Sequence, residues 1–405
     1  MSQHVTMFQQ LSEQLLHHQH FWRPVAFYHN TLAWMTEHPD LVKRLYALSH
    51  DQIDQLAGCS ETLTAFLSDN IPAAPALFAL SQLELAPVKT LSDVSPHFYA
   101  GIPGRKWQQI KAFTQSMDHT SPSITEWCAG KSHLGFYLQH VHKSKIEALE
   151  WDSNLVEQAN QRAQQHNVPL HSHCIDVLNP EAEQYLRQSQ HVVALHACGE
   201  LHEHLLQLSI AHNVNALHLA PCCYHKRRGT VYQPLSTLGR SLDLGLNKTE
   251  LHTAVMETVT AGATVQRQRK QLQIMRLGFD CLQRVLLAKN EFLSVPSLPM
   301  SWAKAEFSDF CRHCAHLVNI ELPLNIDWND YLQQGETRFK QVSALDLVRF
   351  LFRRPIEVWL ALDRALMLEE QGYKVSVTRF CSPAVTPRNI LIQATLKANL
   401  QPYSI

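Results

Sequence analysis

The chain has 405 residues, of which 45% are hydrophobic and 18% charged. A chain of this length and composition buries one sizeable core and further units, which excludes a small scaffold held by disulfides. Lysine and arginine total 35 against 36 aspartate and glutamate, a formal net charge of -1. No overall field therefore attracts nucleic acid or membranes, and any such binding depends on local patches.

The N-terminal residues lack a basic segment followed by an apolar run, and nowhere do about eighteen apolar residues occur in succession. We therefore expect a soluble protein without membrane contact. Its ten cysteines mostly stand in apolar runs, as buried thiols do in a reducing compartment, and they indicate no disulfide framework. These features predict a cytoplasmic location.

The first part of the chain has a helical pattern. Apolar residues recur at spacings of three and four over 41–56 and 61–67. Prolines between Pro72 and Pro103 keep the later helices short. Residues 1–118 are therefore predicted to form a helical N-terminal domain.

Short β-type runs alternate with amphipathic stretches after Pro122, a pattern typical of βαβ units and a parallel sheet. The predicted strands are 124–128, 146–150, 171–175, 191–196 and 216–220. The clearest helix between them is 153–166, which starts with a serine N-cap. Residues 119–225 are predicted to be the first part of a Rossmann-like core.

Helical segments return at 264–287 and 301–317, so residues 226–340 are predicted to be a mostly helical insertion. A strong helix at 356–371, which Gly372 terminates, precedes strands at 373–380 and 389–395. Residues 341–405 are expected to complete the core. The predicted fold class is α/β: a mostly parallel Rossmann-like sheet with a C-terminal β-hairpin, a helical N-terminal domain and a helical insertion.

A glycine turn follows the first predicted strand, and Gly130 there allows the backbone to approach a cofactor closely. Glu150 ends the second strand twenty residues later, a spacing that suits a carboxylate bonded to both hydroxyls of a ribose. Asp176 ends the third strand, where it can accept from an adenine amino group. Together they predict a nucleoside site, although each alone also fits an ordinary turn or a solvated carboxylate.

The same turn allows a second interpretation, because Ala129 to Ser132 looks like the end of a phosphate-binding G-x-x-x-x-G-K-[ST] loop. Thr125 stands where its first glycine belongs, and Trp127 and Cys128 occupy positions at which backbone amides wrap phosphates. No apolar strand ends in an obvious magnesium-binding aspartate. A nucleotide triphosphatase therefore stays a remote alternative.

Polar and soft side chains stand at the ends of the fourth and fifth predicted strands. In an open α/β sheet, ligands bind at the carboxyl ends of the strands, so we expect these side chains to surround one crevice. They are His196, Cys198, Cys222, Cys223, Tyr224 and His225.

At these motifs the sequence resembles a methyltransferase-like family marked by an E-x-x-A-G-K-x-x-L turn, an L-H-x-C-G strand end and a C-C-Y-H strand end. The matching residues are Glu126, Ala129, Gly130, Lys131 and Leu134, then Leu195, His196, Cys198 and Gly199, then Cys222, Cys223, Tyr224 and His225. The family is similar to the eukaryotic tRNA acceptor-stem ribose 2′-O-methyltransferases, which share a Cys-Cys-x-His element. The resemblance covers about 120–240 and 346–400, with Ser132 where relatives usually carry glycine.

The resemblance implies a class I methyltransferase that binds S-adenosylmethionine, with the turn near the methionine moiety, Glu150 at the ribose and Asp176 at the adenine. The expected cofactor-binding residues are Glu126, Cys128, Ala129, Gly130, Lys131, Glu150, Trp151, Asp176 and His196. Arg105 and Lys106 offer a basic pair for the methionine carboxylate or a substrate phosphate, although they also fit a solvated first turn of a helix.

Methyl transfer from a sulfonium is an in-line displacement, so the enzyme mainly aligns the acceptor with the methyl group and excludes water. A hydroxyl acceptor, as in the tRNA relatives, also needs a base, and histidine suits that role at neutral pH. His225 is our first choice, with His196 and Cys223 as further catalytic candidates. The expected substrate-binding residues are Arg105, Lys106, Cys222, Tyr224, Lys226 and Arg227.

The adjacent Cys222 and Cys223 allow three interpretations: a packed structural pair, part of the substrate pocket, or zinc ligation with Cys198 and His225. Neighbouring side chains of a strand point to opposite sides, which disfavours ligation of one ion. We predict no metal site. A C-x-x-C half site at 311–314 has no second half nearby and is expected to be an ordinary helix.

Basic residues follow the double cysteine and recur in the predicted insertion. They are Lys226, Arg227, Arg228, Arg267, Arg269, Lys270 and Arg276. Because each neutralised phosphate adds salt-dependent affinity, we favour RNA, either tRNA or rRNA, as the acceptor. The neutral overall charge leaves a protein or small-molecule acceptor open. Ser132 and the missing acidic catalytic motif leave a non-catalytic scaffold open.

Overall fold

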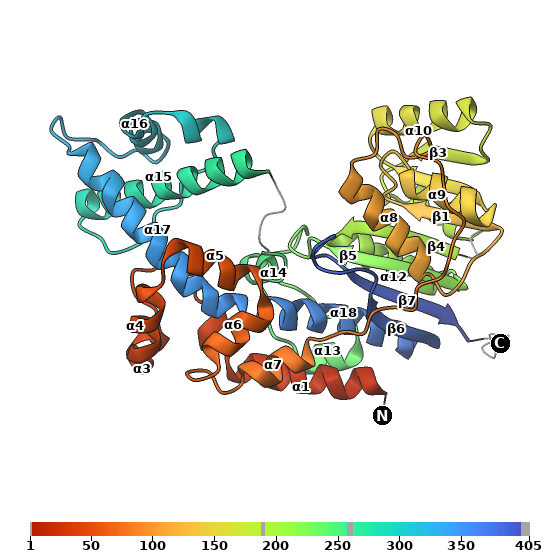
Figure 1. Cartoon of the computed structure of the whole chain (residues 1–405), viewed down its shortest axis with the longest axis horizontal. Helices are drawn as coiled ribbons and strands as arrows, with labels where there is room; N and C mark the ends of the chain where they lie inside the picture. Colours follow the sequence, from red (N-terminus) through yellow and green to blue (C-terminus); the bar gives the residue numbers. More distant parts are fainter. Residues whose placement is uncertain (1, 188–190, 257–261, 398–405) are drawn as a thin grey trace. The chain divides into compact units, whose positions relative to one another are not determined.

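The computed structural model describes residues 2–187, 191–256 and 262–397 (Figure 1). These residues form two compact units: unit 1 comprises Met1–Glu13, Leu80–Val255 and Pro355–Ile405, and unit 2 comprises Gln14–Ala79 and Met256–Arg354. The structure thus groups residues 80–118 and 226–255 with the sheet, whereas the predicted boundaries placed them outside it. Residues 1, 188–190, 257–261 and 398–405 of the predicted domains lie outside the described part.

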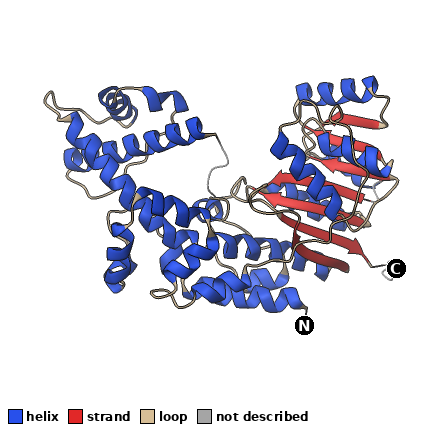
Figure 2. Cartoon of the chain, in the orientation of Figure 1, coloured by secondary structure: helices blue, strands red, loops and turns tan. Residues whose placement is uncertain are grey.

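Unit 1 is built on a seven-stranded sheet, drawn in red in Figure 2. Its strands are β1 (Ser123–Trp127), β2 (Lys145–Glu150), β3 (Leu170–Cys174), β4 (His191–Cys198), β5 (Ala216–Cys222), β6 (Tyr373–Arg379) and β7 (Ile390–Leu396). In the order β3-β2-β1-β4-β5-β7-β6, the first five are parallel to one another, and β7 is antiparallel to both β5 and β6. This confirms the predicted Rossmann-like sheet with a C-terminal hairpin.

Helices cover both faces of this sheet, which is why β4 and β5 are nearly continuous apolar runs. Glu126 of β1 contacts Gly135 on one face, and its neighbour Trp127 donates to the carbonyl of Leu201 on the other. The helices with all or most of their residues in unit 1 are α1 (Gln3–His17), α8 (Gly104–Ser116), α9 (His133–His142), α10 (Ser153–Gln165), α11 (Glu183–Arg187), α12 (Glu200–Ala211), α13 (Thr237–Ser241), α14 (Lys248–Thr253) and α18 (Arg353–Glu370), with a 3-10 turn at Pro180–Ala182.

The segment before α8 belongs to unit 1 because it pairs with the sheet edge. The amide of Ala86 donates to the carbonyl of Arg379 at 2.8 Å, and the Arg379 amide donates to the carbonyl of Glu84 at the same distance. Ile110 and Phe113 of α8 are buried in the core of the sheet. The local sequence pattern of this segment does not reveal such long-range pairing.

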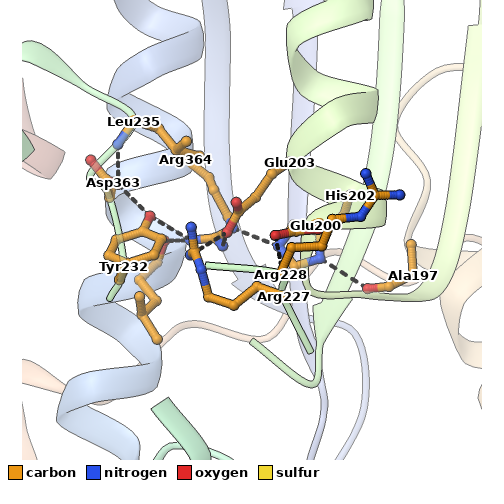
Figure 3. Close-up of polar contacts among 11 residues, drawn as sticks. Ala197, Glu200, His202, Glu203, Arg227, Arg228, Tyr232, Leu235, Asp363 and Arg364 are labelled. Carbon is orange, nitrogen blue, oxygen red and sulfur yellow. Dashed lines mark hydrogen bonds and ion pairs between the residues drawn. The ribbon is translucent and has the colours of Figure 1, made fainter. Parts of the chain in front are cut away.

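The segment after β5 belongs to unit 1 because Asp363 of α18 holds it. The buried Asp363 carboxylate accepts from the Tyr232 hydroxyl at 2.5 Å and from the Leu235 amide at 2.7 Å (Figure 3). It also accepts from the Ser236 amide and hydroxyl at 3.0 and 2.6 Å. A buried carboxylate is stable when hydrogen bonds satisfy it in this way.

Helices are the only regular secondary structure in the described residues of unit 2. Its helices are α2 (Gln19–Trp22), α3 (Ala33–Glu37), α4 (Pro39–Ala47), α5 (His50–Gly58), α6 (Ser60–Leu67), α7 (Ala74–Leu80), α15 (Ala263–Leu287), α16 (Phe307–Leu317) and α17 (Trp328–Phe350), with a 3-10 turn at Met300–Lys304. The predicted helix over 301–317 is therefore this turn followed by α16. Among the described residues, no helix is both long enough and apolar enough to cross a membrane.

Contacts with α17 bring the two stretches of unit 2 together. Arg338 of α17 donates to the carbonyl of Ala26 at 3.1 Å, and Arg349 donates to that of Trp22 at 3.3 Å. Helix α15 crosses α17 closely, since a Cβ on Gly335 would lie 2.5 Å from the Ile274 carbonyl oxygen. Only glycine permits this approach.

Candidate active site

The turn between β1 and α9 has a left-handed backbone. Cys128, Gly130 and Ser132 have φ values of 56°, 58° and 50°. Nothing lies within 4 Å of the place where a Cβ of Gly130 would stand, so a ligand can approach its backbone. At Gly135, a Cβ would lie 2.4 Å from Ser132 Oγ and 2.5 Å from Glu126 Oε2. The helix therefore starts tightly against Glu126.

Glu126 is buried beneath this turn. Its Oε2 accepts hydrogen bonds from the Ser132 hydroxyl and, at 3.0 Å, from the Gly135 amide. Burial raises the pKa of Glu126 to about 7, and the Ser132 hydrogen bond and the charge of Lys106 oppose this increase. These bonds give Glu126 a positioning role in the turn, and its predicted contact with the methionine moiety stays a prediction. The Ser132 hydroxyl also explains how a serine is held where relatives carry glycine.

Glu150, at the end of β2, contacts the glycine turn directly. Its Oε2 accepts from the Gly130 amide at 2.8 Å, and its Oε1 accepts from the amides of Trp151 and Asp152 at 3.0 and 3.1 Å. An ionised carboxylate has about four acceptor positions, so about one stays available for a ribose hydroxyl. The next side chain, Trp151, is 75% exposed.

The ends of four strands meet around Cys128. Burial raises the pKa of this thiol, and the negative groups of Glu150, Cys198 and Asp176 raise it further. Asp176 is exposed, and its Oδ1 accepts from the Leu178 amide at 3.0 Å. An open glycine backbone, a carboxylate with a free acceptor position and an exposed acid thus lie at one edge. These groups fit an adenosyl moiety.

At the end of β4, His196 has a left-handed backbone with a φ of 66°. Its Nε2 lies 3.0 Å from the Gln109 Oε1. Burial lowers the pKa of His196 to about 3, with further lowering by the charges of Lys106 and Arg388. Its Nδ1 is buried without a hydrogen-bond partner among the residues that the structure describes. No sequence pattern singled out Gln109 at this place.

The cysteines at the end of β5 differ from the prediction. Cys222 Sγ donates to the His196 carbonyl at 3.2 Å and lies 3.4 Å from Cys198 Sγ. Cys223 has a φ of 46°, so it leaves the extended conformation, and all three sulfurs lie within 4.8 Å of one another. Hydrogen bonds from Cys198 and Cys222 lower the pKa of the Cys223 thiol. The prediction that the two neighbours point to opposite sides is wrong, because strand geometry ends at Cys222.

The turn after these cysteines is fastened to the start of α12. The Gly199 amide donates to the Cys222 carbonyl at 3.0 Å, and the Glu200 amide donates to the Lys226 carbonyl at 3.1 Å. Gly199 has a φ of 49°, and a Cβ there would lie 1.9 Å from the Lys226 carbonyl oxygen. Only glycine fits between the two strand ends.

Two predicted substrate-binding residues point into the protein instead. Tyr224 is fully buried, with the Arg364 guanidinium 4.8 Å from its ring centre. The Arg227 guanidinium lies 3.5 Å from Glu203 Oε1, which Arg364 also contacts at 2.8 Å (Figure 3). Both guanidinium groups pair with the Glu203 carboxylate, so this placement does not support substrate contact by Tyr224 or Arg227. The adjacent charges of Asp363 and Arg364 within an apolar helix were an overlooked signal for this network.

The remaining predicted residues are more accessible. His225 is half-buried, with a pKa lowered by burial and an Nδ1 that has no hydrogen-bond partner among the described residues. Lys131, Lys226 and Arg105 are exposed. Lys106 is half-buried, and burial lowers its pKa against the opposing charges of Glu126 and Cys222. Ala129, also half-buried, lies in the turn.

The parallel sheet with its antiparallel C-terminal hairpin, and the glycine turn facing a strand-end acid, define a class I methyltransferase. Residues 105–229 match a family model described as a methyltransferase domain. The protein is an enzyme that transfers methyl groups from S-adenosylmethionine.

The solved structure of coclaurine N-methyltransferase bound to N-methylheliamine and SAH is also similar, at 9% identity over 78% of this chain and 94% of that chain, with a TM-score of 0.27. A similarity at this level carries no information about the substrate of this chain.

Proposed function

We propose that the methyl acceptor is RNA. The observation that carries the proposal is a convergence of cations: the charges of Lys106 and Arg388 act on His196, and those of Lys226 and Arg388 act on His225. The three come from α8, from the turn after β5 and from the segment before β7. Phosphates are the ligands that such a cluster binds.

Exposed basic residues support a polyanionic ligand in each unit considered by itself. In unit 1, the side chain of Arg228 is 82% exposed. In unit 2, Arg267 and Arg269 are exposed near the start of α15. Lys270 of the same helix stands over the ring of Phe339 at 5.5 Å. These residues provide contacts that the neutral net charge of the chain does not predict.

Within this proposal, Gly130, Glu150 and Asp176 hold the adenosyl group, and Trp151 lies beside it. Bound S-adenosylmethionine supplies an electrophilic methyl group, which an aligned acceptor displaces in line. His225 is the base that takes the proton of an acceptor hydroxyl. We also propose a cytoplasmic location, because the cysteines are free thiols.

The proposal is tested by incubating the full chain with methyl-labelled S-adenosylmethionine and three separate acceptor pools: total RNA, a protein mixture and a small-molecule extract. We expect label in RNA that ribonuclease releases as nucleotides. Label in protein or small molecules, with none in RNA, contradicts the RNA acceptor and leaves the methyltransferase activity in place.

A second test measures RNA affinity against salt concentration in the variant Lys226→Ala. Losing one phosphate contact should reduce the slope of log affinity against log salt by about 0.7. The matched control is Lys374→Ala, since Lys374 is exposed and pairs through β7 with the start of β5, at the opposite edge of the sheet. Equal slopes in the two variants contradict a phosphate contact at Lys226.

A further inference from the structure

The carboxyl edge of the sheet holds a cluster of three thiols, from Cys198, Cys222 and Cys223. Their sulfurs lie within 4.8 Å of one another, and those of Cys198 and Cys222 are 3.4 Å apart. In a tetrahedral zinc site with Zn–S bonds of about 2.3 Å, sulfurs lie about 3.8 Å apart. The Cys198–Cys222 separation of 3.4 Å lies below this value, and the other two separations do not exceed 4.8 Å, so small side-chain rotations suffice.

The backbone gathers these sulfurs at a conformational cost. His196 and Cys223 are both left-handed, a state that is unfavourable for a non-glycine residue and persists where the surroundings enforce it. Gly199 permits the turn after β5 to approach the end of β4. Without these positive φ values, Cys223 would point away from Cys222, and the three thiols would not share one place.

The chemistry of the cluster selects the metal. All three ligands are sulfur, which excludes Ca²⁺ and Mg²⁺ and favours Zn²⁺. Three thiolates around Zn²⁺ carry a net charge of -1. The positive charge of Lys226 interacts electrostatically with Cys223, and that of Lys106 interacts with Cys222. Nearby cations therefore compensate the complex in a partly buried place.

We propose that Cys198, Cys222 and Cys223 bind one Zn²⁺ ion as three thiolates, leaving a fourth position for an exogenous ligand. Each ligating thiol that is still protonated releases its proton to solvent on binding. The ion ties the end of β4 to the end of β5, beside the place where the methyl acceptor is proposed to bind. The site does not depend on the nature of that acceptor.

The test uses the full chain, reduced and treated with a chelator, then titrated with Co²⁺. We expect a sulfur-to-cobalt charge-transfer band that saturates at one ion per chain and disappears when Zn²⁺ is added. The variant Cys223→Ser should weaken Co²⁺ binding by at least about 100-fold, because even outer-shell changes cost about 10–100-fold. Cys174→Ser, an exposed cysteine at the end of β3, is the matched control and should bind normally.

A second measurement needs no variant. Alkylation of the native protein, followed by mass spectrometry, should show Cys198, Cys222 and Cys223 protected when Zn²⁺ is present and modified after chelation. Absence of the cobalt band in the reduced protein, an unchanged band in Cys223→Ser, or equal alkylation with and without Zn²⁺ overturns the proposal. A Cys198–Cys222 disulfide whose reduction gives no metal uptake overturns it as well.

Discussion

Both edges of the sheet collect histidines, but they use them differently. At the amino edge, Nε2 of His191 lies 2.7 Å from Nδ1 of His218, whose Nε2 lies 2.9 Å from the Asp118 carboxylate. At the carboxyl edge, His196 and His225 each have a buried Nδ1 without a partner among the described residues. Titratable side chains alone therefore do not mark a site. The open Gly130 backbone beside the Glu150 carboxylate distinguishes the carboxyl edge instead.

Among the variants that test the comparison of the two sheet edges, we expect the largest loss of stability at Gly199. Gly199→Ala places a Cβ against the Lys226 carbonyl at a left-handed residue, so we expect a loss of about 4 kcal/mol or more in the free energy of unfolding. Urea unfolding measures it. Gly104→Ala, with open space at its Cβ, should change stability by no more than about 1 kcal/mol. Similar stability in both variants would show that the carboxyl edge is not constrained as described.

A smaller effect is expected for cofactor binding at the same edge. Glu150→Gln removes a carboxylate that accepts hydrogen bonds from the Gly130 amide and from the Trp151 amide at the end of β2. Charge-assisted hydrogen bonds contribute about 1.5–3 kcal/mol, so affinity for S-adenosylmethionine should fall about 10- to 100-fold in calorimetry. Glu147→Gln, on the same strand but bonded to His173 and Lys145, serves as the control. Equal affinities would place the cofactor elsewhere.

The histidines at the amino edge should make the free energy of unfolding depend on pH. Burial lowers the pKa of His191 and of His218, with contributions from His119 and His142 and an opposing one from Asp118. Below pH 6.5 the unfolded chain therefore binds more protons, and stability present above that pH falls with acidification. From pH 7 to 5 the loss is at most about 2 kcal/mol per histidine. His218→Gln should flatten urea unfolding against pH, and an unchanged slope would contradict this account.

The smallest effect is expected at Arg228, whose side chain is 82% exposed and lies 4.0 Å from Glu200. Arg228→Ala should change unfolding free energy by less than about 0.5 kcal/mol. Its neighbour Arg227 lies beside the buried Glu203, so Arg227→Ala should lower the free energy of unfolding by about 1–3 kcal/mol. Thermal unfolding of the two variants distinguishes an inward from an outward basic residue. Equal losses would contradict the orientation of Arg227.

The sequence could predict the strands, because buried parallel strands are apolar runs with clear ends. It could also place Gly130 and Glu150 together, since the spacing of a βαβ unit brings both to one sheet edge. The directions of side chains beyond the end of a strand were harder to predict from the sequence. The left-handed backbone at Cys223 turns the following residues, and Tyr224 and Arg227 enter the interior as a result.

The extent of each unit could not be predicted from local pattern. The bonds that attach residues 226–255 to the sheet end on Asp363, more than a hundred positions away. Similarly, Arg338 joins α17 to residues near Ala26. Hydrophobic periodicity shows the type of an element, whereas its partner depends on which charged side chains meet after folding.

The interleaving of the two units has a consequence for synthesis on the ribosome. The chain passes from one unit to the other at residues 13/14, 79/80, 255/256 and 354/355. The N-terminal helices of unit 2 must therefore wait for α17, and the sheet stays open until β6 and β7 emerge. Nascent chains that stop before α17 expose apolar surfaces of both units, and such surfaces are the ones that chaperones bind.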